Sequence, residues 1–168
     1  MKSTLRALGL VAALGSTVLV SGCGSTSGTA AVVDGQRITE DEVRLAAQQI
    51  NEQFKPQTPL TAKTALMFLV VEPAAKATAQ KSGLPVTSDG ALRSRFDKVH
   101  DVSPAALGVL RSNIILSTLN QSNPQLVSQV ARQALAMKPS INPRYGKLSA
   151  ETLELQPTAP AWISTAKS

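Results

Sequence analysis

Few side chains in this 168-residue chain are of the types that enzymes use, and they form no recognisable catalytic pattern. The only histidine, His100, precedes Asp101, which could make it a general base oriented by a carboxylate. We favour a histidine at a helix end that interacts with the helix dipole. Ser112, Ser117 and Thr118 supply hydroxyls without a neighbouring base. The sequence contains no phosphate-binding glycine loop, nucleophile elbow or metal-binding histidine pair, so we expect neither an enzyme nor a cofactor.

Three adjacent acids, Glu40, Asp41 and Glu42, could suggest a cation site. Acidic residues in the first turn of a helix are already explained by the helix dipole and by capping. The pattern therefore favours a helix start, and we expect no metal.

Cys23 is the only cysteine, and its surroundings indicate processing. Lys2 and Arg6 precede an apolar run over residues 7–20, and small residues follow, which is the layout of a secretory signal. The run is shorter than the roughly 20 apolar residues that a membrane helix needs. Val20-Ser21-Gly22-Cys23 resembles the lipobox of bacterial lipoproteins, which implies cleavage before Cys23 and attachment of a diacylglyceryl group to it. The alternative is a small, buried apolar side chain.

These features predict how the chain is divided and where it is located. Residues 1–22 would be a lipoprotein signal peptide, and residues 23–29 a lipidated cysteine with a flexible Gly/Ser/Thr tether. Two acyl chains anchor a protein stably, so no further membrane segment is needed. The apolar stretch over residues 65–71 is too short to be one. We expect a palmitate-type lipid anchor on the extracytoplasmic face of the cell membrane.

Composition favours one helix-rich domain. Removing 22 of the 168 residues leaves 146, the size of a single domain. The removed segment holds two of the 17 basic residues and none of the 11 acids, so the remainder carries a net charge of +4. Its basic residues are scattered and aromatic residues are few, which argues against a nucleic-acid partner. With Cys23 lipidated, no thiol remains for a disulfide or a zinc site.

Capping signals and apolar periodicity predict about five helices. Thr39 and Glu42 form a capping box before an apolar face that runs to Phe54. The second helix should span residues 61–82, with a bend or split at Pro73. The remaining helix starts are Thr87 or Ser88, Ser103-Pro104 and Asn123-Pro124. The third helix should carry Leu92, Phe96 and Val99 on one face.

Short extended segments flank the helices. Residues 31–33 are a strand candidate before a tight turn at Asp34-Gly35, and residues 140–142 are another before Pro143. Residues 147–168 are rich in Pro, Thr and Ala and are expected to form a C-terminal tail, in which Trp162 and Ile163 are the only adjacent bulky pair.

Three patches resemble the N-terminal domain of SurA- and PrsA-type foldases. They are Ala31-Val-Val-Asp-Gly-Gln-Arg-Ile-Thr39 with the acids after it, the junction over residues 77–89, and Ser140-Ile-Asn-Pro-Arg-Tyr-Gly146. The resemblance implies that the first strand pairs with the strand after the last helix and closes a helical domain over residues 30–146. Residues 31–33 would then pair with residues 140–142, and the Asp34-Gly35 turn and Arg144 would be structural. A free-standing hairpin across Asp34-Gly35 is disfavoured, because isolated two-stranded hairpins are marginal.

One part of the family's pattern is missing. Many members carry a parvulin prolyl-isomerase domain between the helices and the closing strand, whereas here Lys138-Pro139 joins them directly. The resemblance therefore implies the chaperone part without isomerase activity. The expected fold is mainly α, with about five helices closed by a two-stranded β element.

The sequence thus predicts a lipid-anchored chaperone or holdase that binds unfolded secreted polypeptides in an apolar groove. The alternative is a structural lipoprotein that binds one dedicated cell-envelope partner. The candidate client-binding residues lie in the apolar second helix, where an ordinary core role is the competing interpretation; they are Leu66, Met67, Val70 and Val71.

Overall fold

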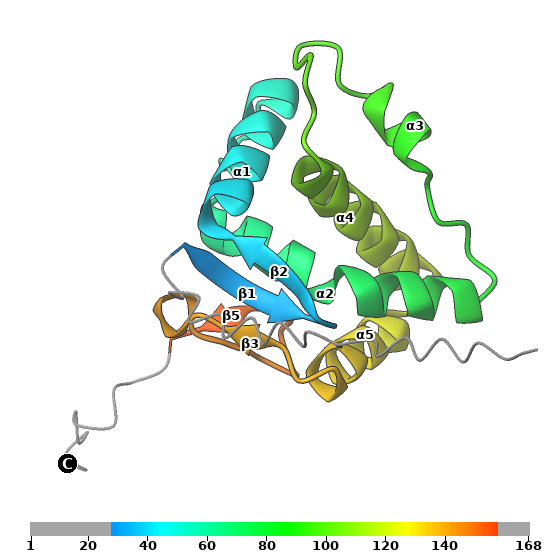
Figure 1. Ribbon diagram of the computed structural model, residues 1–168. Coiled ribbons are helices and arrows are strands. Elements are labelled where there is room, and N and C mark those ends of the chain that lie inside the picture. Colours follow the sequence, from blue (N-terminus) through cyan, green and yellow to red (C-terminus); the bar gives the residue numbers. More distant parts are fainter. Residues whose placement is uncertain (1–27, 158–168) are drawn as a thin grey trace, which may run out of the picture.

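A short β-sheet lies against a set of helices that account for most of the fold (Figure 1). The structure, a computed structural model, describes residues 28–157. The elements within that range are β1 (Thr29–Val33), β2 (Gln36–Thr39), α1 (Glu40–Phe54), α2 (Ala62–Lys81), α3 (Asp89–Arg93), α4 (Pro104–Ser122), α5 (Pro124–Ala136), β3 (Ser140–Ile141), the 3-10 turn η1 (Pro143–Tyr145), β4 (Lys147–Leu148) and β5 (Leu155–Gln156). The predicted mainly helical fold with a small antiparallel sheet is confirmed.

The sheet joins the two ends of the helical region in the strand order β2-β1-β3. Ala31 is paired with Ile141 and Val32 with Ser140, as expected from the family resemblance. The sheet has three strands rather than two, because the hairpin across Asp34-Gly35 forms as well. Asp34 and Gly35 have φ angles of 50° and 74°, which suit a tight turn between twisted strands. The hairpin is not free-standing, since β3 covers the other edge of β1.

The segment predicted as a tail from residue 147 onward is structured at its start. β4 and β5 pair as a second antiparallel hairpin, with Leu148 opposite Leu155. Leu148, Leu153 and Leu155 are buried and belong to the same core as the helices. Because the buried side chains of the described residues lie between Ala30 and Leu155, a fragment that begins at Gly24 retains this core.

The helix starts are those that the sequence predicts. The Thr39 side chain accepts a hydrogen bond from the Glu42 amide at 3.2 Å, and the Glu42 carboxylate accepts one from the Thr39 amide at 2.7 Å. Ser88, Ser103 and Asn123 also act as N-caps, each with its side chain accepting a bond from the first turn. These ends depend on contacts within a few residues, which is why the sequence locates them.

The third helix is much shorter than expected. It ends at Arg93, so Phe96 and Val99 lie in an irregular segment rather than on a helical face. Side chains of α1 bind the backbone of that segment and compete with the helical pattern. Gln49 and Gln53 both accept hydrogen bonds from its amides.

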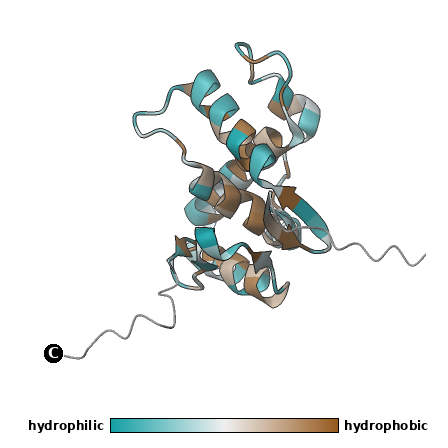
Figure 2. Cartoon of the chain, turned by 60° about the vertical axis from the view of Figure 1, so that its left-hand side comes forward, coloured by the Kyte–Doolittle hydropathy of each residue, from teal (hydrophilic) through white to brown (hydrophobic). Residues whose placement is uncertain are grey.

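Helix α2 is the centre of the fold and contacts α1, α4, α5, β1 and β5. Figure 2 shows the hydrophobic segments gathered in the middle of the molecule, with mostly hydrophilic loops outside. Of the bend or split expected at Pro73, the split does not occur: α2 runs unbroken from Ala62 to Lys81. A proline inside a helix costs about 3 kcal/mol, and burial of the surrounding side chains offsets it.

One ion pair crosses the interface between α2 and α4. Arg111 on α4 donates to the Glu72 carboxylate at 2.5 Å, and their side chains are 10% and 20% exposed. Arg111 also pairs with Asp89 and donates to the Thr87 carbonyl, so it ties the start of α3 to the helices. Gly108, one turn before Arg111, leaves space for Glu72: an added Cβ would lie 2.7 Å from Glu72 Oε2 and 3.0 Å from Leu69 Cδ2.

Gly108→Ala should therefore destabilise the protein although alanine favours helices. Overpacking costs about 1–3 kcal/mol and the gain in helix propensity is about 1 kcal/mol, so we expect a net loss of about 1 kcal/mol in the free energy of unfolding. Urea denaturation followed by circular dichroism would measure it.

Gly90→Ala is the matched control, because nothing lies within 4 Å of a Cβ added in α3. It should stabilise the fold or leave it unchanged. Equal gains from the two substitutions would show that Gly108 does not make room for Glu72.

Candidate functional site

A cavity with a mainly apolar lining lies at the meeting point of α1, α2 and α4. We call it the apolar groove. Its volume is about 300 Å³, and its lining residues are Ile50, Phe54, Pro56, Thr58, Leu60, Phe68, Val109, Leu110 and Asn113. None of these side chains is ionisable, and the two polar ones are Thr58 and Asn113. Such a lining suits apolar groups of a ligand and offers no acid or base for catalysis.

The wall contributed by residues 55–60 is positioned by one side chain of α1. The Asn51 amide donates to the Leu60 carbonyl at 2.9 Å, and its oxygen accepts from the Leu60 amide at 2.7 Å. Asn51 thus pairs with this loop as a neighbouring strand would. The pairing holds Leu60 at the groove although the loop has no regular structure of its own.

Phe54 lies at the edge of the groove and is 43% exposed. Its ring packs edge to face against Phe96 with the centroids 5.4 Å apart, which is a favourable aromatic geometry. Phe96 belongs to residues 84–103, which we call the strap; it connects α2 to α4 and includes α3. The strap arches around α4 toward the end of α1 (Figure 1). Phe54 therefore contacts the strap as well as the groove.

Two glutamines one turn apart on α1 hold the strap, mainly through its backbone. Gln49 donates to the Asp101 carbonyl at 2.7 Å and accepts from the Ser103 amide at 2.9 Å. Gln53 donates to the Asp97 carboxylate at 2.5 Å and accepts from the Lys98 amide at 2.9 Å. Both glutamines are buried, and these bonds satisfy their amide groups. The strap is thus fixed to α1 largely by hydrogen bonds.

Three of the four residues predicted to bind clients lie in the core. Leu66, Val70 and Val71 are 0% exposed, so no client can touch them in this conformation. The physical reason is that helices and strands pack around most of α2, and its apolar run favours such burial. The prediction of these three residues as a binding surface is corrected.

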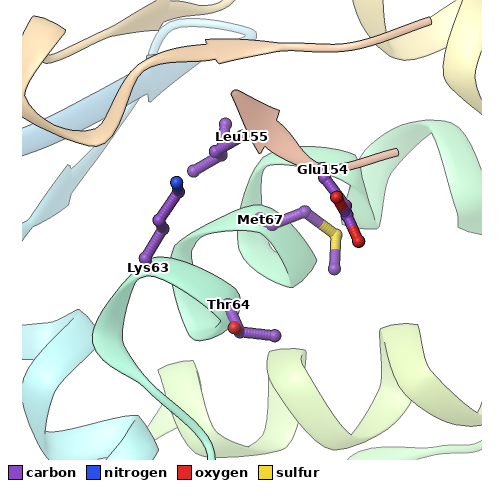
Figure 3. Close-up of a pocket in the computed structure, with 5 residues that line it drawn as sticks. All are labelled: Lys63, Thr64, Met67, Glu154 and Leu155. Carbon is purple, nitrogen blue, oxygen red and sulfur yellow. The ribbon is translucent and has the colours of Figure 1, made fainter. Parts of the chain in front are cut away.

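Met67 is only partly buried and lies at a different pocket, between α2 and the β4–β5 hairpin (Figure 3). This pocket has a volume of about 280 Å³ and is lined by Lys63, Thr64, Met67, Glu154 and Leu155. Two of the five side chains are charged, so it is a less suitable place for apolar segments than the apolar groove.

The other residues considered for catalysis or metal binding are either exposed or paired with neighbouring side chains. His100 is exposed in the strap rather than at a helix end, which corrects that expectation. Glu40 accepts two hydrogen bonds of 2.9 Å from Arg144, and Asp41 pairs with Arg44 at 2.7 Å. Within residues 28–157 no group of three His, Cys, Asp or Glu side chains has the geometry to hold a metal. Cys23, Trp162 and Ile163 lie outside the described residues.

The sequence contained an incomplete signal for the groove. The apolar face predicted after the capping box ends at Phe54. Phe68 and Leu110 belong to helices that are apolar on several sides, so periodicity cannot say which side stays accessible. Only packing decides this.

The hydrogen bond from Gln53 should make the strap sensitive to acid. It is the main reason why the pKa of Asp97 lies below its ordinary value of 3.8; backbone amides at Asp97 and Lys98 contribute. The resulting stabilisation is present above the pKa of an unfolded aspartate, about 3.9, and is lost as the pH falls through the lower folded value. Gln53→Ala should raise the pKa of Asp97, as a carboxyl-carbon NMR titration would detect. An unchanged titration midpoint would contradict the assigned bond.

Among residues 28–157, none of the helices combines the length and the apolar character that crossing a bilayer demands. Comparison of the chain with protein families, curated proteins and solved structures gives no match. The function therefore has to be inferred from the groove and from the residues themselves.

Proposed function

We propose that the protein is a lipid-anchored extracytoplasmic holdase that binds unfolded secreted polypeptides without isomerising their prolyl bonds. The observation that carries this proposal is the apolar groove, which is open, free of ionisable side chains and bordered by an exposed phenylalanine. The resemblance to SurA- and PrsA-type foldases supports the same function, and the pairing of β1 with β3 is consistent with that resemblance.

The size of the groove favours weak, exchanging contacts. A volume of about 300 Å³ accommodates a few side chains of an extended segment rather than a folded partner. If a client buries roughly 300 Å² of apolar surface, the hydrophobic term is about 7.5 kcal/mol at 25 cal/mol per Å². Association costs about 4–15 kcal/mol, which offsets most or all of this gain. A holdase needs such reversibility because it must release its client without an energy source.

The cell-surface anchor is the second part of the proposal. Diacylation of Cys23 would keep the domain beside newly secreted chains. This part rests on the charge order and the lipobox-like residues of the sequence. No membrane-spanning helix is needed for such an anchor.

The groove is best tested by replacing its exposed aromatic residue. We expect Phe54→Ser, in the fragment from Gly24 to Ser168, to reduce suppression of the aggregation of a denatured model client by at least threefold. Light scattering at stoichiometric amounts would measure this. The reason is that the substitution removes an apolar contact at the rim of the groove.

Leu45→Ser is a closely matched control. Leu45 is 42% exposed and Phe54 43% exposed, they lie on the same helix, and nine residues place them on opposite faces. Leu45→Ser should leave suppression unchanged. Equal losses from both variants, or no suppression by the unaltered fragment, would refute the proposal that the apolar groove binds clients. A photo-crosslinker at position 54 that captures one stoichiometric partner would instead favour the structural lipoprotein.

Lipidation can be checked independently. Expression of the full chain in a bacterial host should yield a product that begins at Cys23 and carries the mass of a diacylglyceryl group, and Cys23→Ser should abolish that mass. Mass spectrometry of the detergent phase would show it. A secreted product with a free thiol at Cys23 would exclude the anchor and leave the groove proposal intact.

A further inference from the structure

A third cavity lies between the end of α5, β3 and β4, and we call it the basic cavity. Its volume is about 410 Å³, and it is lined by Leu135, Lys138, Pro139, Ser140, Ile141, Gly146, Lys147 and Leu148. Four of these residues have apolar side chains, two are lysines, and none carries a carboxylate. The lining thus combines two positive charges with an apolar surface, which suits an anionic amphiphile.

Lys138 has a left-handed backbone at the end of α5, as Lys55 has at the end of α1. Its φ angle is 50°, in the left-handed region, and its amide bonds the Leu135 carbonyl at 2.9 Å to close the end of α5. Glycine is favoured at this position because it has no Cβ. What distinguishes Lys138 from Lys55 is that it lines a cavity. The lysine is exposed, so its ammonium group can reach a ligand.

The basic cavity is close to the start of the described chain. Ser140 and Ile141, which line it, pair with Val32 and Ala31 of β1. Asn142 next to them bonds the carbonyls of Thr29 and Ala30. Cys23 precedes Gly28 by five residues, which span at most about 18 Å when fully extended. If Cys23 is anchored in lipid, this end of the sheet stays near the membrane surface.

We propose that the basic cavity binds an anionic phospholipid of the membrane in which the protein is anchored. Lys138 and Lys147 would pair with the phosphate, and Leu135, Ile141 and Leu148 would cover the adjoining apolar part of the lipid. This inference rests on the lipid anchor in the proposed function. The lipid is favoured over a free phosphate compound because half of the lining is apolar.

Such binding would orient the apolar groove. Helix α1 begins beside the sheet at Glu40 and ends at Phe54, 15 residues later, so its axis is about 22 Å long. Figure 1 shows α1 extending away from the strands and from α5. With the basic cavity on the membrane, the groove would lie at the far end of α1, where secreted chains can reach it.

Vesicle binding tests the inference without an acyl chain or a client. The fragment from Gly24 to Ser168 should bind vesicles that contain phosphatidylglycerol and not vesicles of phosphatidylcholine alone, as measured by flotation. Each lysine near an anionic surface raises the partition coefficient onto vesicles about fivefold. Lys138→Gln with Lys147→Gln should therefore weaken binding about 25-fold. Arginine at both positions should restore it.

Three controls separate a site from general charge and from misfolding. Lys63→Gln with Lys81→Gln makes the same charge change at exposed positions outside both the basic cavity and the apolar groove, and it should alter binding less than twofold. Lys138→Gly relieves the left-handed backbone, so it should weaken vesicle binding without lowering the melting temperature. Aggregation suppression should be unchanged in all these variants.

Equal losses from the two lysine pairs, or no binding to anionic vesicles, would overturn the lipid site. Displacement of the fragment from vesicles by millimolar glycerol phosphate would also overturn it and assign the cavity to free phosphate compounds. In each case, retained aggregation suppression would leave the holdase proposal standing.

Discussion

The fold depends on the burial of α2 on most of its sides. Its apolar run allows α1, α4, α5 and the strands to pack around it, and each fully buried leucine or valine contributes about 1.5–3 kcal/mol. The same burial explains why the helix continues through Pro73 and why Leu66 is out of reach of any ligand. The same packing leaves the Glu72 side chain only 20% exposed. A carboxylate with so little access to water needs a charged partner, and Arg111 supplies it where Gly108 leaves space.

Helix α1 organises the parts of the chain that have little regular structure. Asn51 pairs with the loop that forms one wall of the apolar groove, whereas Gln49 and Gln53 hold the strap. Amide side chains suit this task because each offers both a donor and an acceptor to a peptide group. The groove is therefore bordered by a loop fixed through two hydrogen bonds, and Phe54 at its edge also contacts the strap through Phe96. Segments held in this way open more easily than packed helices do.

The two proposed binding sites lie in different parts of the fold. The apolar groove lies at the end of α1, and the basic cavity lies beside β1 and β3, where the chain leads back toward Cys23. A peptide-binding protein attached to a membrane needs this separation, because an apolar groove that faced the bilayer would compete with lipid for its client. The different linings agree with the two roles: the groove has no ionisable side chain, and the cavity has two lysines.

Local chemistry in the sequence determined the helix starts, the Asp34-Gly35 turn and the predominance of helix. These features depend on contacts between residues a few positions apart. The pairing of β1 with β3 spans more than a hundred residues, and only the family resemblance indicated it. The tertiary structure alone decided that the strap leaves the helical pattern, that the supposed tail begins with a hairpin, and that Phe54 rather than Val70 borders a groove. The physical reason is that an apolar side chain has the same character whether it is covered or not, and only the arrangement of distant elements around it determines which it is.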